Sequence, residues 1–367
     1  MAGINELRPR AGIDALRVYE PGRPLEEVAR EHGLDPSALV KLASNENNLG
    51  PSPKAVAAMQ NAASTMHLYP DGGAFYLRNM LSEKLGVSRD QLVFGNGSNE
   101  LIEFLGHVFL EPGTNIVMSE CAFVIYKLVA SACGAETLAA PMKNFTHDLD
   151  AMAELVNDHT RLVFVANPNN PTGTRVDNQK LKSFLENLPA HVLPVLDEAY
   201  VELLAEEDQP ASLQWMETGR PLMIMRTFSK TYGLAGIRLG YGVSHSDVIS
   251  MLEKFRQPFN VNAMAQAAAI AALEDDAFVE QTRKWVREGL TFFETAFSRM
   301  GLDVVPSCAN FLLVKTGKSR ETFQALQRKG VIARPMDVYG LSDWLRLSVG
   351  TPEENQRAVE LLEEIVV

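Results

Sequence analysis

The sequence is poor in cysteine, and it lacks both a long apolar run and a cluster of positive charge. Its three cysteines, Cys121, Cys133 and Cys308, are odd in number and have no metal-ligand spacing, which is typical of buried thiols in a reducing compartment. No apolar stretch approaches the roughly 18 residues that a membrane helix needs, and residues 1–17 lack the apolar core of a signal peptide. We therefore expect a cytoplasmic protein that does not cross a membrane.

The charge of the chain is one-sided. Its formal net charge of -12 argues against a nucleic-acid-binding surface, because phosphate backbones call for clustered Lys and Arg. An anionic substrate must then be held by a few local cations. The histidines are scattered and no two have helical metal-binding spacing, so the sequence predicts no metal site.

Short apolar runs alternate with longer helical patterns through the first two thirds of the chain. This repetition predicts right-handed crossovers and a mainly parallel sheet that is covered by helices on both faces. We expect strands at residues 91–94, 115–118, 162–166, 192–196 and 222–225, and helices at residues 53 onward, 74–85, 99–110, 122–133 and 178–188.

After residue 242 the pattern becomes mainly helical and then alternates again. Strands are expected at residues 302–305, 311–315, 331–334 and 344–349, beside helices at residues 320–329 and 352–365. A chain of 367 residues suggests about two domains. We expect an α/β protein with an N-terminal arm over residues 1–44 that packs with the small domain, a large domain over residues 45–260, and a smaller α/β domain over residues 261–367.

One stretch, residues 226–240, sets a single lysine among glycines and hydroxyls just after an apolar run. Lys230 is a candidate nucleophile, because a lysine becomes useful when its surroundings ease its deprotonation. Ser229 and Arg238 could each bind an anion. Taken alone, the stretch also fits a solvated turn.

Other polar residues follow the expected strands. Ser98 and the backbone N–H groups before it stand where a strand runs into a helix, a place that suits an anion, although Ser98 could equally cap the helix. Asn170 lies in an Asn- and Pro-rich loop, and turn formation alone does not explain three asparagines there. Asp197 and Tyr200 follow another apolar strand, where Asp197 could cap a helix or pair with a cation. The combination suits one small, phosphorylated, ring-shaped cofactor.

These motifs, taken in order, resemble a known family over almost the whole chain. Gly-Ser-Asn-Glu, Asn-Pro-Thr-Gly, Asp-Glu-Ala-Tyr, Ser-Lys and Gly-Ile-Arg-Leu-Gly are similar to those of the fold-type-I aminotransferases that use pyridoxal 5'-phosphate. Within that group, Leu-Ala-Ser-Asn-Glu-Asn, Tyr-Pro-Asp, Arg-Thr-Phe-Ser-Lys and Leu-Arg-Leu-Ser-Val-Gly-Thr resemble the histidinol-phosphate aminotransferases most closely.

The resemblance implies a role for each cofactor-binding candidate. Lys230 would join the cofactor aldehyde through an imine and later move a proton, and Asp197 would pair with the ring nitrogen. Tyr200 and Asn170 would bond the phenolic oxygen of the ring. The remaining candidates are Phe123 against the ring face, Ser98, Asn99, Ser229 and Arg238 at the phosphate, and Tyr69 from a neighbouring subunit, which implies a homodimer with shared active sites.

The resemblance also implies substrate-binding residues. Arg346 would grip the α-carboxylate of glutamate or 2-oxoglutarate, with Asn45 on the same side. Arg334 and Tyr19 would lie around the phosphate of histidinol phosphate, although Arg334 could also be an exposed charge at a strand end. Two residues depart from the usual family pattern: Asn48 replaces a proline, which affects loop stiffness, and Phe123 replaces a tyrosine, which removes a hydroxyl.

Three other functions are compatible with this scaffold. An aromatic amino-acid aminotransferase and a threonine-phosphate decarboxylase share the cofactor site, and differ in the substrate pocket or in the group that leaves. A cofactor-binding transcription regulator of the same fold would need an added DNA-binding module, and the acidic chain with its short N-terminal arm disfavours it. The leading expectation is ping-pong exchange of the amino group between glutamate and imidazole-acetol phosphate in histidine biosynthesis.

Overall fold

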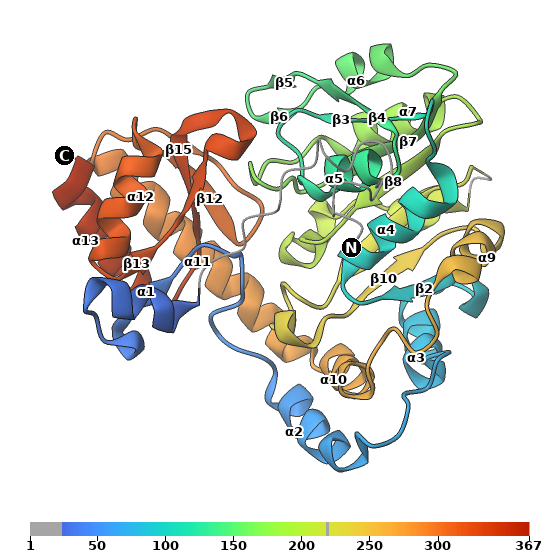
Figure 1. The fold of residues 1–367 in the computed structure, drawn as a ribbon, viewed down its shortest axis with the longest axis horizontal. Coiled ribbons are helices and arrows are strands. Elements are labelled where there is room, and N and C mark those ends of the chain that lie inside the picture. Colours follow the sequence, from blue (N-terminus) through green and yellow to red (C-terminus); the bar gives the residue numbers. More distant parts are fainter. Residues whose placement is uncertain (1–23, 218–219, 367) are drawn as a thin grey trace, which may run out of the picture.

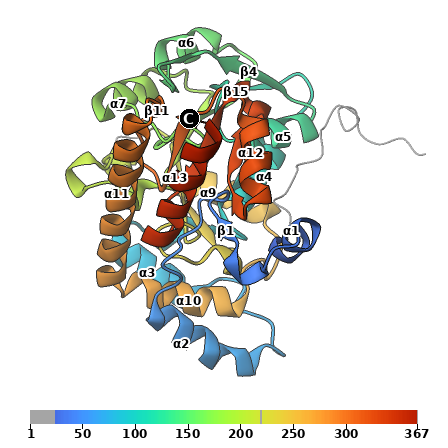
Figure 2. The ribbon, with the colours of Figure 1, turned by 90° about the vertical axis from the view of Figure 1, so that its left-hand side faces the viewer.

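The computed structural model describes residues 24–217 and 220–366, and is organised around two sheets (Figures 1 and 2). Figure 1 shows the larger sheet with its helices on the right and the smaller sheet with α12 and α13 on the left. Among the described residues, no helix has the length and apolar character needed to cross a membrane.

The larger sheet has seven strands, and only β10 runs against its neighbours. Every other neighbouring pair is parallel, as the strand-helix alternation predicts. The strands in spatial order are β2 (Leu92–Gly95), β10 (Gly240–Val243), β9 (Met223–Thr227), β8 (Leu193–Asp197), β7 (Thr160–Ala166), β3 (Asn115–Ser119) and β4 (Glu136–Ala140).

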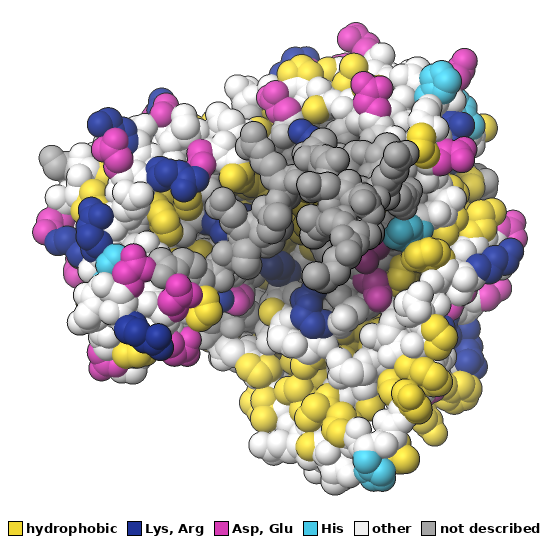
Figure 3. Space-filling model, in the orientation of Figure 1, with side chains coloured by type: hydrophobic (Ala, Val, Ile, Leu, Met, Phe, Trp, Pro, Cys, Tyr) yellow, Lys and Arg dark blue, Asp and Glu magenta, His cyan; other side chains and the backbone are white. Residues whose placement is uncertain are grey.

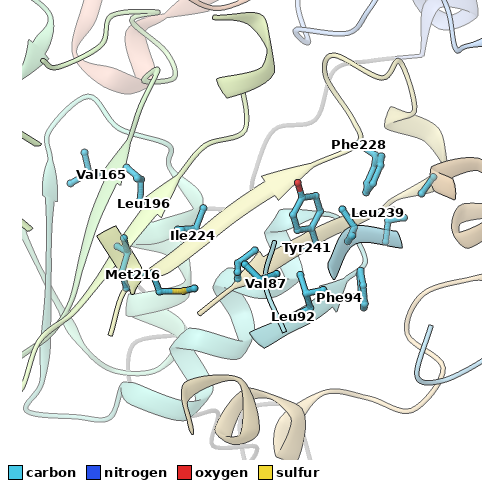
Figure 4. Packing of buried hydrophobic residues seen from close by; sticks show 14 of the residues in the cluster. Val87, Leu92, Phe94, Val165, Leu196, Met216, Ile224, Phe228, Leu239 and Tyr241 are labelled. Carbon is cyan, nitrogen blue, oxygen red and sulfur yellow. The ribbon is translucent and has the colours of Figure 1, made fainter. Parts of the chain in front are cut away.

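Helices cover both faces of this sheet, because side chains alternate along each central strand. On β7, Val163 and Val165 pack into one apolar cluster while Leu162 and Phe164 pack into the other. Figure 4 shows part of the first cluster. The helices of this part are α2 (Pro53–Ala62), α3 (Phe75–Leu85), α4 (Ser98–Phe109), α5 (Ile125–Ala132), α6 (Leu149–Leu155), α7 (Asn178–Asn187), α8 (Ser212–Met216), α9 (Ser246–Phe255) and α10 (Ala263–Leu273).

The smaller sheet has four antiparallel strands and its own apolar core. In spatial order they are β11 (Val304–Val305), β12 (Phe311–Lys315), β15 (Leu341–Ser348) and β14 (Arg334–Met336). The helices α11 (Asp276–Arg299), α12 (Ser319–Arg328) and α13 (Pro352–Val366) pack against it. Near α1 (Leu25–His32), β1 (Val40–Lys41) pairs with β13 (Val331–Ile332) in parallel.

The expected fold class, a large domain with a mainly parallel sheet and a smaller α/β domain, is confirmed. Several local expectations are wrong. The strand expected at residues 331–334 is divided, because β13 pairs with β1 while Arg334 begins β14 beside β15. The chain also contains strands that the pattern does not predict, namely β4, β10 and the hairpin of β5 (Met142–Lys143) and β6 (Thr146–His147).

Glycine explains why β10 escapes sequence analysis. A Cβ on Gly240 would lie 2.3 Å from the backbone N of Ser98, and one on Gly242 would lie 2.2 Å from the Met223 side chain. Strand glycines weaken the β signal, yet here they allow the close approach of a helix terminus and of a neighbouring strand. β10 therefore brings the start of α4 against the loop that contains Lys230.

Candidate active site

Lys230 lies in the loop that follows β9 and is partly buried. Its Nζ donates to the backbone oxygens of Asn45 at 3.2 Å and Ser44 at 3.4 Å. Burial, together with the nearby cation of Arg346, lowers the pKa of the amine to about 8. A lysine with this pKa has a substantial neutral fraction near neutral pH, which is what a nucleophile or general base requires.

Asp197 ends β8, the strand next to β9, and only 6% of it is exposed. Its Oδ2 accepts from the hydroxyl of Tyr126 at 2.6 Å, and its Oδ1 accepts from the backbone N–H of Ala199 at 3.1 Å. Burial raises the pKa of this carboxyl, and the bond from Tyr126 opposes that rise. A buried carboxylate gains from a cationic partner, such as a protonated ring nitrogen, because that partner offsets the cost of burying the charge.

Tyr126 is a site residue that sequence analysis missed. It lies on α5, its ring stacks on Phe164 at 4.4 Å with an interplanar angle of 11°, and its edge-to-face partner at 5.7 Å is Phe123. The partly buried Phe123 and the Tyr126–Asp197 bond therefore lie side by side. No signal in the sequence near Tyr126 marks it as a site residue, because Phe123 lies just before the first residue of α5 (Ile125).

Tyr200 and Asn45 form a hydrogen bond close to Lys230. Asn45 Nδ2 donates to Tyr200 Oη at 3.0 Å, and Lys230 Nζ lies 5.7 Å from the centre of the Tyr200 ring. Burial raises the pKa of Tyr200 to about 12, so the phenol keeps its proton over the physiological range. Asn45 has a φ of 53°, a conformation that asparagine tolerates better than most residues. This backbone geometry turns its oxygen toward Lys230 and its side chain toward Tyr200.

Arg346 on β15 reaches from the smaller sheet to the loops of the larger one. Its Nη1 donates to Asn170 Oδ1 at 2.7 Å, and its Nη2 donates to the Ala43 oxygen at 2.8 Å. Arg334 pairs directly with Arg346 across the antiparallel strands. Opposed residues of such a pair point to the same face of the sheet. Two guanidinium groups thus share one face, which suits a substrate with two separated anionic groups.

Besides the two arginines of the smaller sheet, the N-terminus of α4 is a second site that suits an anion. The helix is capped by Gly97, which offers no side chain, so the interpretation of Ser98 as the cap residue is wrong. Ser98 and Asn99 are the first two helical residues, and their backbone N–H groups have no partner within the helix. Helix termini of this kind bind anions.

Arg238, in the segment that also contains Lys230, lies beside the N-terminus of α4 and adds a cation to this site. Its Nη1 donates to Ser229 Oγ at 3.4 Å, and a Cβ on Gly97 would lie only 2.4 Å from its Nη2. The guanidinium therefore packs onto the bare backbone of Gly97, and both Gly97 and Arg238 have a positive φ. Helix N-terminus, hydroxyls and guanidinium together fit a phosphate group.

One predicted residue, Tyr69, stands apart from this cluster. Tyr69 is 84% exposed and stacks on Phe259 at 4.8 Å. Tyr19 lies outside the described residues. Figure 3 shows hydrophobic groups gathered over the lower part of the molecule, where α2, α3 and α10 lie. Besides Phe259, large exposed hydrophobic residues near Tyr69 in the sequence are Met66, Leu68, Phe75 and Tyr76.

The geometry defines a class of enzyme. A deprotonatable lysine, a buried carboxylate and a helix terminus that suits a phosphate meet at the loops beyond the carboxyl ends of parallel strands, where α/β sheets bind their ligands. This arrangement is that of a lysine-dependent enzyme with an α/β fold that holds a phosphorylated aromatic cofactor.

Comparison with known proteins agrees with that class. The sequence profile of the family "Aminotransferase class I and II" matches residues 37–362. The chain is 47% identical to the histidinol-phosphate aminotransferase of Akkermansia muciniphila over 352 residues, 96% of both chains. It is 48% identical to that of Methylobacillus flagellatus over 356 residues, 97% of this chain and 96% of the relative. The protein belongs to the class I and II aminotransferase family, within the group of histidinol-phosphate aminotransferases.

A solved structure of the same group extends the likeness to three dimensions. The histidinol-phosphate aminotransferase of Sinorhizobium meliloti, crystallised in complex with pyridoxal-5'-phosphate, has a TM-score of 0.88 and 27% identity, and the match covers 98% of this chain and 97% of that one. The family resemblance expected from the sequence is thereby confirmed. An L-threonine-O-3-phosphate decarboxylase from Porphyromonas gingivalis, at 24% identity and a TM-score of 0.79, shares the fold alone.

Proposed function

We propose that this protein is a pyridoxal 5'-phosphate-dependent histidinol-phosphate aminotransferase. It exchanges the amino group between L-histidinol phosphate and 2-oxoglutarate, giving imidazole-acetol phosphate and L-glutamate, in histidine biosynthesis. The observation that carries this proposal is the lysine of lowered pKa between Asp197 and the α4 terminus, in a chain nearly half identical to such enzymes along its full length.

The residues at the site fit the cofactor. When bound, pyridoxal 5'-phosphate supplies an electron sink that stabilises negative charge at the substrate carbon. Asp197 would face its ring nitrogen and Phe123 its ring face, and Tyr200 and Asn170 would donate to its phenolic oxygen. Ser98, Asn99, Ser229 and Arg238 would hold its phosphate, and the bare backbone of Gly97 leaves room for the Arg238 guanidinium there.

Lys230 has two tasks in this mechanism. Its neutral Nζ would bind the cofactor covalently, and would take a proton from the substrate Cα once substrate has displaced it. The pKa of about 8, lowered by burial and by Arg346, supports both tasks, because only the unprotonated amine can attack or accept a proton. Asp197 would stay ionised if it faced a protonated ring nitrogen, since that partner would offset the cost of burying the carboxylate.

Two arginines select the substrates. Arg346 would bind the α-carboxylate of glutamate in a two-bond contact, with Asn45 on the same side. Arg334, on the same sheet face and opposite Arg346, would bind the phosphate of histidinol phosphate together with Tyr19. The separation of two cations on one face supports a site that accepts both a dicarboxylate and a phosphorylated amino alcohol in alternation.

We further propose a homodimer with shared active sites, in which Tyr69 reaches the cofactor phosphate of the partner subunit. Its 84% exposure and its exposed apolar neighbours support this assignment, because contiguous apolar patches mark interfaces. We divide each chain into an arm at residues 1–44, a large domain at 45–260 and a small domain at 261–367. The pairing of β1 with β13 supports placing the arm with the small domain.

Amino donors offered one at a time test the function. Purified protein reconstituted with pyridoxal 5'-phosphate is mixed separately with histidinol phosphate, glutamate and phenylalanine, and the absorbance of the cofactor is followed. We expect histidinol phosphate and glutamate to convert it to the pyridoxamine form. If phenylalanine converts it and histidinol phosphate does not, the protein is an aromatic amino-acid aminotransferase. Release of carbon dioxide from threonine phosphate would identify the decarboxylase instead.

A further inference from the structure

The Tyr200 hydroxyl is held from the smaller sheet through one intermediate side chain. Ser348 Oγ donates to Asn45 Oδ1 at 3.1 Å, and Asn45 Nδ2 donates to Tyr200 Oη at 3.0 Å. The three residues are 1%, 2% and 3% exposed, respectively. Bulk water therefore does not compete for these bonds, and the orientation of each group is decided by its neighbours in the chain.

The direction of these bonds follows from the number of protons available. Ser348 Oγ accepts the backbone N–H of Asn45 at 2.8 Å, and its own single proton is then left for Asn45 Oδ1. With Oδ1 turned to Ser348, the amide presents Nδ2 to Tyr200, and an amide nitrogen can only donate. Tyr200 Oη accepts this bond, so its one proton is free for another acceptor. An amide rotated by 180° would place Oδ1 against Tyr200 and take that proton.

We propose that Ser348 and Asn45 are positioning residues that keep the Tyr200 hydroxyl a hydrogen-bond donor toward the phenolic oxygen of the cofactor. The proposal rests on the function proposed above, which places Tyr200 at that oxygen. It assigns Asn45 a task beyond the substrate carboxylate, and it gives Ser348 a role that no motif in the sequence indicates.

Asn170, the second residue that would donate to the ring oxygen, is also oriented by a side chain of β15. Arg346 and Ser348 are two apart on β15 and so point to one face of the sheet. Arg346 donates to Asn170 Oδ1, which leaves the amide nitrogen of Asn170 to donate elsewhere. One face of β15 thus sets the direction of both side chains that would meet the ring oxygen, Asn170 and Tyr200.

Donation to the ring oxygen has a measurable consequence. It favours the anionic oxygen, and so lowers the pH at which the Lys230-bound cofactor loses its proton and changes colour. Without the Ser348 hydroxyl, the Asn45 amide has no preferred direction and Tyr200 gives part of its proton to Oδ1. We expect Ser348→Ala to raise the midpoint of the colour change by roughly half to one pH unit, the usual effect of one hydrogen bond to a charged form.

A double-mutant cycle in the holoenzyme tests this inference. The absorbance of protein reconstituted with pyridoxal 5'-phosphate is titrated with pH, without substrate, for wild type, Ser348→Ala, Tyr200→Phe and the double variant. Ser348→Ala should raise the midpoint in wild type and change nothing when Tyr200 is already phenylalanine. Ser348→Thr, which keeps the hydroxyl, should restore a midpoint close to that of wild type. An equal shift with and without Tyr200 would mean that Ser348 acts only on the structure.

The outcomes separate this inference from the proposed function. A wild-type protein without the absorbance band of a lysine-bound cofactor would contradict the function itself. A band that is present, with a midpoint that Ser348→Ala leaves unchanged, contradicts only the role of Ser348. If Ser348→Ala does not fold, as judged by circular dichroism, Ser348→Cys, whose thiol is only a weak hydrogen-bond donor, replaces it in the same cycle. A shift that disappears with Tyr200→Phe then supports the inference, and one that persists overturns it.

Discussion

The Tyr126 hydroxyl donates to Oδ2 of Asp197 at 2.6 Å and fixes the carboxylate at the end of β8. Oδ1 is held separately by the backbone N–H of Ala199. The Tyr126 ring is itself fixed by stacking on the buried Phe164. The orientation of the carboxylate is therefore set by an aromatic side chain of α5 together with the backbone of Ala199.

Tyr126→Phe should weaken the function of Asp197 without unfolding the protein. The bond lowers the pKa of Asp197, so its loss should favour the protonated carboxyl and weaken the pairing with a ring nitrogen. We expect cofactor affinity and kcat to fall by about five- to tenfold each, which corresponds to roughly 1–1.5 kcal/mol for one hydrogen bond. Tyr241→Phe is the matched control, because Tyr241 is also buried and bonds Arg226 away from the site. Equal losses in both variants would contradict this role.

Lys230→Ala should remove the absorbance band of the lysine-bound cofactor and lower turnover by at least about a thousandfold, because both the covalent link and the proton acceptor are lost. Absorbance spectra and steady-state rates with histidinol phosphate measure these effects. Catalysis at the normal rate would overturn the mechanism. We expect the variant to keep non-covalent binding of the cofactor, without the band, because the residues proposed to hold the phosphate remain.

Gly97→Ala should displace Arg238 from the phosphate-binding place. The new Cβ would lie 2.4 Å from Arg238 Nη2, and the φ of 83° is strained for any residue with a side chain. We expect the affinity for pyridoxal 5'-phosphate to fall by about ten- to a hundredfold, measured by fluorescence titration of the apoprotein. Gly86→Ala is the matched control: Gly86 also has a positive φ, of 68°, but its Cβ would meet nothing within 4 Å. Equal affinities for the two variants would contradict the packing argument.

The two arginines on the small sheet should affect different substrates. Arg346→Lys should lower kcat/KM for glutamate by about ten- to a hundredfold, because lysine cannot make the two-bond contact with a carboxylate. Arg334→Lys should mainly raise the KM for histidinol phosphate. Both half-reactions are measured separately by cofactor absorbance. Identical effects of the two variants on both substrates would rule out the assignment of one arginine to each anionic group.

Glu202 should make the protein less stable as the pH rises. Burial raises the pKa of this carboxyl from 4.5 to about 7, and Oε2 has no hydrogen-bond partner within the described part of the chain. The folded state holds a proton that the unfolded state releases, so the contribution is fully present below pH 4.5 and is lost as the pH rises through 7. Glu202→Gln should therefore raise Tm by a few degrees at pH 8 and less at pH 5, in thermal melts of the apoprotein. A larger gain at pH 5 would contradict the assignment.

Local signals in the sequence were sufficient to predict the polar candidate residues that follow the strands of the large sheet. Apolar runs predict the strands before Asp197 and Lys230, and the polar residue at the end of each strand is placed at one edge of the sheet by the parallel topology alone. Most of the helices from α2 to α13 follow from apolar spacing and glycine or proline boundaries, with ends that differ by a few residues, whereas the short helices α6 and α8 were not predicted. The order of these elements and motifs was enough for the fold class and the family.

Contacts between distant parts of the chain required the tertiary structure. Nothing near Tyr126 in the sequence indicates that its hydroxyl bonds Asp197, 71 residues away, and nothing near Ser348 indicates that it orients Asn45, 303 residues away. Side-chain directions of this kind depend on how helices and sheets pack, and the apolar pattern is silent about them. The glycine-containing β10 was missed for the same reason, since it is stabilised by its neighbours on both sides and not by its own side chains. The sequence by itself thus determined the fold class, the family and most of the candidate residues for the chemistry, whereas the packing of two sheets decided how each of these residues is oriented and by which neighbour.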